Sequence, residues 1–174
     1  LVQVDKKFLD LPYNKDHVGL NHLASTRFAI LFPEDSFGKE YATEYFKTVE
    51  DMGLSVTAAE SYNPDQSDFL TQIQNMVGTS FPGFRRTEAQ DLVKALETRL
   101  TRPPTKKELE ALRVPPIVDF DVLFLPDTFK AVGQITPALL YADVTQVRLM
   151  GPSSWNNFKL LERAGQYLEN AMFV

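Results

Sequence analysis

The sequence predicts an α/β fold, a three-layer sandwich in which a mostly parallel five-stranded sheet lies between helices and carries a helical insertion. Short apolar runs alternate with amphipathic segments along most of the chain, which is typical of strands alternating with helices. The runs at 27–32 (RFAILF) and 120–125 (FDVLFL) are apolar almost throughout, as expected for strands buried on both faces. A basic, proline-bracketed stretch at 85–113 interrupts the alternation.

The first half of the pattern contains two strands and two helices. Each helical segment has an apolar stripe at helical spacing, and Gly53 and Gly78 are placed to end the helices. Asp65 or Ser67 can cap the second helix. We expect these elements, in chain order, at residues 27–32, 38–52, 54–59 and 67–77.

The second half repeats the alternation after the insertion. Strand–helix alternation with apolar strands indicates a parallel sheet covered by helices on both faces. Right-handed crossovers then place every strand-to-helix turn at the same edge of the sheet. Pro137 is expected to bend the first helix of this half. We expect the elements, in chain order, at residues 120–125, 128–142, 146–150, 156–165 and 171–174.

The insertion contains two further helices. Thr87-x-x-Gln90 and Thr105-x-x-Glu108 are both capping-box patterns. The stretch 85–113 has a net charge of +3, so the remainder of this −5 chain carries −8. We expect a helical hairpin packed on the domain, and a partner-binding arm is the alternative. The expected boundaries are a lead-in segment at 1–26, which contains a short helix at 16–24, and an α/β lobe at 27–174 that includes the insertion at 79–118.

Composition excludes several classes of protein. The 174 residues suit one globular domain, and 44% apolar residues with a mean hydropathy of −0.20 exclude a mostly disordered chain and a membrane bundle. No apolar run approaches the roughly 20 residues that span a bilayer, so direct membrane insertion is not expected. The acidic balance disfavours a nucleic-acid partner. Because there is no cysteine, thiol nucleophiles, disulfides and cysteine-ligated metals are excluded.

Motifs for catalysis and cofactor binding are missing from the sequence. There is no Gly-x-Gly-x-x-Gly, no phosphate loop and no Gly-x-Ser-x-Gly elbow. His17 and His22 are five residues apart, which places them on different helix faces and makes them a poor metal pair. Asp119 and Asp121 are best interpreted as a solvated strand end. The sequence therefore predicts no catalytic residue, no cofactor and no metal site.

Ligands of parallel α/β sheets bind at the carboxyl ends of the strands, near the point where the strand order reverses. A remote alternative use of such turns is a phosphoacceptor receiver domain, in which Glu34, Asp35 and Asp127 would hold Mg²⁺. The insertion is foreign to that class of domain. Trp155 can either stack on a ligand or pack the end of the sheet. The candidate turns are residues 33–38, 62–68, 126–129 and 151–156.

Two long runs of the sequence resemble the second lobe of type I periplasmic binding proteins, the receptors for branched-chain amino acids and similar solutes. The first is FAILFPEDSFGKEYATEYFKTVEDMGLSVTAAESYNPDQSDFLTQI, in which one turn is like the family's Asp-x-x-Tyr-Gly and another is like its Tyr-x-x-x-x-x-Asp-Phe. The second run covers residues 119–174, and together the two runs make up about three fifths of the chain. The insertion and the turns PDTF and SWN are most similar to a lipoprotein subgroup of receptor-like proteins and penicillin-binding protein activators.

This resemblance implies a two-lobed, non-enzymatic receptor that closes on a small solute, with a first lobe that is missing from this chain. It also implies a periplasmic or other extracytoplasmic location, a lipid anchor through a missing N-terminus, and a cell-wall synthase or transporter as a possible protein partner. The alternative within the same resemblance is a protein–protein interaction module that regulates a cell-wall synthase without a small ligand.

The family's cleft positions can be carried over residue by residue. This sequence departs from the family at Phe37, where amino-acid binders have Tyr, and at Ser153, where they often place an acidic residue for the ligand's ammonium group. A desolvated ammonium needs such a partner, so we expect that this lobe does not bind a free α-amino group in the usual way. The carried-over ligand-binding residues are Asp35, Ser36, Phe37, Thr128, Phe129, Ser153 and Trp155.

Overall fold

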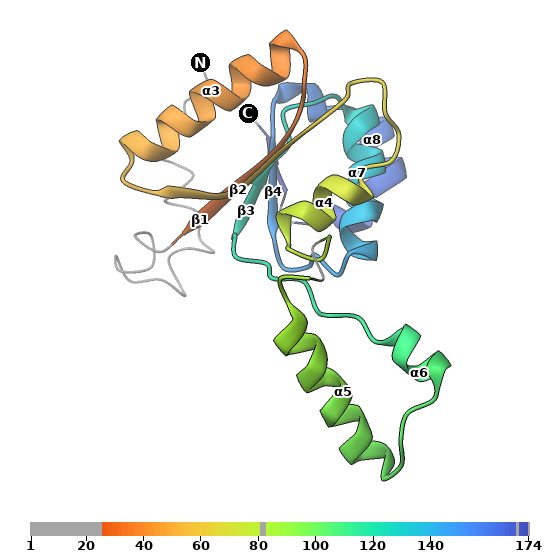
Figure 1. Ribbon diagram of the computed structural model, residues 1–174. Helices are drawn as coiled ribbons and strands as arrows, with labels where there is room; N and C mark the ends of the chain where they lie inside the picture. The colour runs from red at the N-terminus through yellow and green to blue at the C-terminus, as the bar shows by residue number, and fades with distance from the viewer. Residues whose placement is uncertain (1–25, 81–82, 170, 174) are drawn as a thin grey trace, which may run out of the picture.

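Five parallel strands form one sheet in the order β2-β1-β3-β4-β5 (Figure 1). The structure, a computed structural model, describes residues 26–80, 83–169 and 171–173. The strand order reverses at β1, whose two neighbours are β2 and β3. The predicted parallel α/β sheet is therefore confirmed. The strands are β1 (Arg27–Pro33), β2 (Ser55–Tyr62), β3 (Val122–Phe124), β4 (Arg148–Gly151) and β5 (Met172–Phe173).

Helices cover both faces of the sheet, as Figure 1 shows. On one face, Tyr45 of α3 (Ser36–Asp51) stacks on Phe124, with ring centroids 4.7 Å apart. The other face is covered by α4 (Leu70–Met76), α7 (Phe129–Tyr141) and α8 (Phe158–Ala164), with the short 3-10 turns η2 (Ser153–Trp155) and η3 (Gly165–Tyr167).

Residues of β1 alternate between the two halves of the core. Phe28 and Ile30 pack with α3, whereas Ala29 and Leu31 pack with the helices of the opposite face. All four are at most 2% exposed, because successive strand side chains point to opposite faces and both faces are covered. Burial on both faces explains why this strand is a continuous apolar run.

Glycines end the first two helices as predicted, but the helix starts differ from the prediction. Gly53 and Gly78 have φ of 70° and 68°, the left-handed conformation that terminates helices. α3 starts two residues earlier than expected, because the Asp35 carboxylate accepts the Gly38 N–H at 2.7 Å. α4 starts three residues later than expected.

The expected cap of α4 was wrong. Neither Asp65 nor Ser67 caps the helix; the Asp68 carboxylate accepts the Leu70 N–H at 2.9 Å. The Asp65 N–H instead binds the Asn63 side chain at 3.0 Å, which forms a local turn that competes with helix.

In the second half, boundaries move by two residues for local reasons. β4 begins at Arg148 because Gln146 has a φ of 62°, which is incompatible with a strand. α8 begins at Phe158 because Asn157 caps it by accepting the Lys159 N–H at 3.0 Å. Pro137 lies inside α7, which continues to Tyr141.

The insertion extends away from the rest of the molecule as an arm, which we define as residues 85–113 (Figure 1). It contains α5 (Arg86–Leu100) and α6 (Lys106–Ala111). The expectation that this hairpin packs on the domain was therefore wrong, and within the arm only Arg85 and Leu96 are buried. The expected short helix in the lead-in segment, with His17 and His22, lies outside the described residues.

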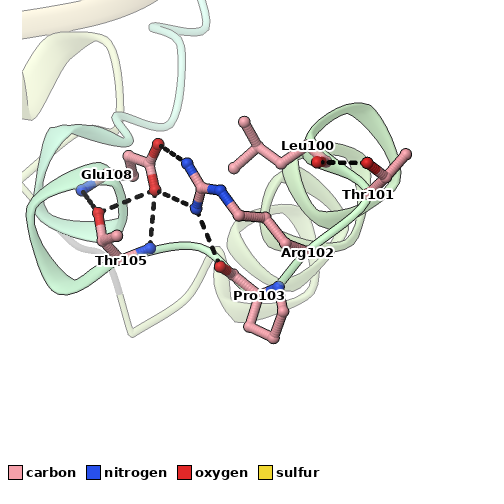
Figure 2. Close-up of polar contacts among 6 residues, drawn as sticks. All are labelled: Leu100, Thr101, Arg102, Pro103, Thr105 and Glu108. Atoms are coloured by element: carbon pink, nitrogen blue, oxygen red, sulfur yellow. Dashed lines mark hydrogen bonds and ion pairs between the residues drawn. The ribbon is translucent and has the colours of Figure 1, made fainter.

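Polar contacts brace the arm at both ends. At its base, the Arg85 guanidinium binds the Glu88 carboxylate and donates to the Pro115 carbonyl at 2.6 Å. This arrangement replaces the predicted Thr87 capping box, because the helix starts one residue before Thr87. At the tip, the predicted Thr105–Glu108 capping box is present, and Arg102 binds the same carboxylate at 2.8 Å and 3.0 Å (Figure 2).

Within the described residues, no helix combines the length and the apolar character needed to cross a membrane.

Candidate functional site

The turns that follow β1, β2, β3 and β4 lie along one edge of the sheet, because all the strands are parallel. We call this edge the rim and define it as residues 33–38, 62–68, 125–129 and 151–156. The strand order reverses between β1 and β3, whose residues pair directly from Phe28↔Val122 to Ile30↔Phe124. The turns after these two strands therefore start side by side, as expected for a ligand site in a sheet of this class.

The first turn brings a helix start directly against the end of β1. A Cβ on Gly38 would lie 2.0 Å from the Pro33 carbonyl oxygen, so only glycine allows this approach. Asp35, Ser36 and Phe37 are consequently presented at the rim, and all three are exposed. Phe37 is 45% exposed, and its ring packs on Tyr41 with centroids 4.6 Å apart.

A buried tyrosine connects three of the turns. The Tyr62 carbonyl accepts the Glu34 N–H at 2.8 Å, and its hydroxyl donates to the Asp127 carboxylate at 2.5 Å. The other carboxylate oxygen of Asp127 accepts the Thr128 N–H at 2.5 Å. Burial, with the bond to Asp127 as a second cause, raises the pKa of Tyr62 above its usual range, so the hydroxyl stays a neutral donor.

The fourth turn is tied to the third through the Asp127 backbone. The Asp127 carbonyl accepts the Ser154 hydroxyl at 3.1 Å and the Trp155 indole N–H at 3.2 Å. The Trp155 side chain is 2% exposed and lies over Gly151, where a Cβ would be 2.0 Å from the ring. Of the two interpretations of Trp155, packing of the end of the sheet is the one that this arrangement matches.

The structure brings all of the predicted turns together at the rim but gives their side chains different surroundings. Asp35, Ser36, Phe37, Thr128 and Ser153 are exposed there. Phe129 is half-buried against the core, and Trp155 belongs to the core itself. Ligand contact by the exposed residues stays a prediction.

Sequence reasoning missed Tyr62 as a positioning side chain. The signal in the sequence that could have indicated this role is the spacing between Tyr62 and Phe69, which lies seven residues later. The two rings meet edge to face, with centroids 4.9 Å apart, and this contact holds the tyrosine in place. The bond to Asp127 spans 65 residues, which no local pattern reveals.

Hydrogen bonds already engage the two rim carboxylates of Asp35 and Asp127. In the part of the chain that the structure describes, no three His, Asp or Glu side chains are close enough to hold a metal ion. Asp35 caps α3, and Asp127 binds Tyr62 and Thr128, so both carboxylates already have partners. At the opposite edge of the sheet, Asp121 accepts the Arg27 N–H at 2.8 Å and stays exposed.

Comparison with known proteins finds similarity at the level of structure. No protein-family model and no curated protein matches the sequence. A leucine-binding protein of Thermotoga maritima is similar over 87% of this chain, with a TM-score of 0.56 and 12% identity. A type 1 periplasmic binding protein of Bordetella pertussis is similar over 84%, with a TM-score of 0.53 and 15% identity.

The chain spans about a third of the length of these two proteins, 32% and 29% respectively. At such low identity the likeness concerns the fold alone. The chain therefore has a fold that is found in one part of type I periplasmic binding proteins.

Proposed function

We propose that this chain is the second lobe of a two-lobed extracytoplasmic receptor, which binds a small solute between its lobes by hinge closure. In this proposal the chain does no catalysis, and the rim faces the first lobe. The observation that supports the proposal most strongly is the rim itself. Four polar turns lie at one edge of a parallel sheet, at the reversal of strand order, and hydrogen bonds fix them before any ligand arrives.

The similar structures include a leucine-binding protein, which favours a solute of amino-acid size. We infer that the ligand lacks a free α-amino group bound in the usual way, because Ser153 stands where an acidic partner for the ammonium would be needed. Ser153 is exposed at the rim, and its uncharged hydroxyl supplies no counter-charge for an ammonium. Micromolar binding of leucine or valine by the complete receptor, measured by calorimetry, would overturn this inference.

A thermal-shift screen tests the receptor proposal. The complete two-lobed gene product and this chain alone are screened in parallel with amino acids, amino-acid derivatives and peptidoglycan fragments. A solute that binds only the native state stabilises it by about 2.7 kcal/mol at a hundred times its Kd, so the melting temperature rises by several degrees.

We expect the shift in the complete protein and little or none in this chain alone. Half a cleft buries too little of a small ligand, since a complete binding pocket covers roughly 70–90% of the surface of its ligand. The proposal fails if no solute shifts the complete protein, or if the isolated chain responds equally well.

The arm favours a second candidate function, a lipid-anchored periplasmic module that docks on a cell-wall synthase or transporter without a small ligand. The arm projects from the edge opposite the rim, has a net charge of +3 and is braced at its base and its tip. Binding of a purified synthase that is lost when the arm is replaced by a linker, together with no solute response, would favour this candidate.

A further inference from the structure

We propose that Tyr62 and Asp127 are positioning residues of the rim, which hold the turns after β1, β3 and β4 in one fixed arrangement without contacting the solute. The functional meaning of this inference rests on the proposed receptor function. Its structural content, a mechanical connection along the rim, does not depend on any ligand.

The backbone ladders that pair β3 with β1 and β4 stop before the turns begin, whereas the β1–β2 ladder continues to Pro33↔Tyr62. Pairing of β1 with β3 ends at Ile30↔Phe124, and pairing of β3 with β4 ends at Phe124↔Met150, followed by one bond from the Leu125 N–H to the Met150 carbonyl at 2.8 Å. Beyond this level other bonds must hold the turns, because an unconstrained turn is free to move.

The bonds that follow form a continuous path across four strand ends. The path starts at the Glu34 N–H, passes through the Tyr62 carbonyl and side chain to the Asp127 carboxylate, and leaves the Asp127 carbonyl toward Ser154 and Trp155. Asp127 alone accepts four hydrogen bonds, from Tyr62, Thr128, Ser154 and Trp155. Tyr62 and Asp127 therefore form the one link on this path that joins β2 to the turn after β3.

Burial makes this link costly to break. Tyr62 is 2% exposed and its ring is fixed by Phe69, so the hydroxyl has no easy alternative partner in water. Asp127 is half-buried, so removal of the Tyr62 hydroxyl takes one hydrogen-bond donor away from a carboxylate that water reaches only in part. We therefore expect the turn that contains Asp127, and the Trp155 indole bound to it, to loosen.

The experiment measures solvent exchange of the Trp155 indole proton in Tyr62→Phe, in the full chain and without ligand. The chain has a single Trp, so its indole N–H gives a single resolved NMR signal. Tyr45→Phe is the matched control: Tyr45 is 1% exposed and donates to the Ala29 carbonyl at 3.3 Å on the opposite face of the sheet. The two variants lose the same atom from equally buried rings.

We expect Tyr62→Phe to accelerate exchange of the Trp155 indole proton by roughly tenfold, and Tyr45→Phe to leave it unchanged at matched global stability. Equal rates in both variants, or no acceleration in Tyr62→Phe, overturn the proposal. If Tyr62→Phe does not fold, Asp127→Asn serves instead. It keeps the backbone carbonyl but replaces one acceptor oxygen with a donor, and the same acceleration is expected.

The indole-exchange experiment contains no ligand, so its result does not depend on the outcome of the solute screen. If the receptor proposal fails while the indole exchange changes as expected, the positioning role stands as a property of the fold. If a solute is found, Tyr62→Phe should also weaken its binding.

Discussion

Two glycines allow the backbone elements of the rim to approach one another more closely than any side chain permits. Gly38 lies against the Pro33 carbonyl, and Gly151 lies under the Trp155 ring. In both cases the close approach places a turn of the rim at the end of a strand. At these two glycines, the geometry of the candidate site depends on the absence of a Cβ atom rather than on the backbone freedom of glycine.

Gly38→Ala should therefore destabilise the protein strongly. The new Cβ would lie 2.0 Å from backbone, which cannot move aside as a side chain can, and we expect a loss of about 3 kcal/mol in the free energy of unfolding. Urea titration followed by circular dichroism measures the loss. Gly165→Ala is the control, because nothing lies within 4 Å of its Cβ and its φ of −53° suits any residue, so a change below about 1 kcal/mol is expected. Similar losses in both variants would contradict this interpretation.

At the arm tip, three contacts converge on one carboxylate (Figure 2). Hydrogen bonds from the Arg102 guanidinium, and then from the Thr105 backbone and hydroxyl, lower the pKa of Glu108 from 4.5 to about 2. Since the folded pKa is depressed, the contact stabilises the tip above pH 4.5 and is lost as the pH falls toward 2.

Arg102→Ala should raise the pKa of Glu108 toward its ordinary value, because it removes the largest cause of the shift. Titration of the carboxyl carbon by NMR measures the pKa. Lys107→Ala removes the same charge one residue from Glu108 but leaves the hydrogen bonds from Arg102 and Thr105 to the carboxylate in place, and we expect it to change the pKa far less. An equal rise in both variants would show that net charge, rather than the hydrogen bond, causes the shift.

At the scale of elements, the arm is largely independent of the sheet. It leaves the chain after α4 and returns before β3, and its contacts with the rest of the chain include the bond from Arg85 to Pro115. Just beside it, the Ile117 N–H binds the Val77 carbonyl at 3.0 Å. Most residues of the arm are exposed, so the core of the sheet gains little from it.

Replacement of residues 86–114 by a short Gly-Ser linker should leave the α/β fold intact. We expect a cooperative thermal transition with a melting temperature within a few degrees of the parent, because the core residues are untouched. Circular dichroism during heating provides the measurement. The comparison is a replacement of α4, which buries Ile73 in the core and should abolish cooperative unfolding. Loss of cooperativity in the linker variant would mean that the arm belongs to the core.

Much of the element pattern could be predicted because it depends on short-range periodicity. The apolar run of β1 and the stop at Gly53 are local signals, and both are confirmed. Helix starts were less predictable, because several polar residues compete to cap and differ by small free energies. For example, the Asp68 carboxylate, rather than Asp65 or Ser67, accepts the N–H of Leu70 at the start of α4.

The candidate site could be predicted as a place but not as a network. Parallel strands imply that the turns share one edge, so the rim follows from topology. The bond between Tyr62 and Asp127 joins residues 65 apart in the sequence. The arm projects because its helices do not pack on the sheet. Neither feature leaves a local pattern in the sequence.

At the scale of the whole molecule, the rim and the arm lie at opposite ends of the sheet (Figure 1). The arm carries a net charge of +3, and the remainder of the chain, which includes the rim, carries −8. This separation means that a solute site at the rim and a partner site on the arm can be tested without mutual interference.

The proposed receptor function requires the rim to form one wall of a solute-binding cleft. Calorimetric titration of the complete protein tests it, using the solute that raises the melting temperature most. Ser36→Arg places a bulky charge on the exposed first turn of the rim, and Ser55→Arg places the same group on the exposed start of β2 at the opposite edge. We predict that Ser36→Arg weakens binding by roughly tenfold or more while Ser55→Arg leaves it unchanged. Equal affinity in the two variants, or no solute that binds at all, would contradict the proposed receptor function.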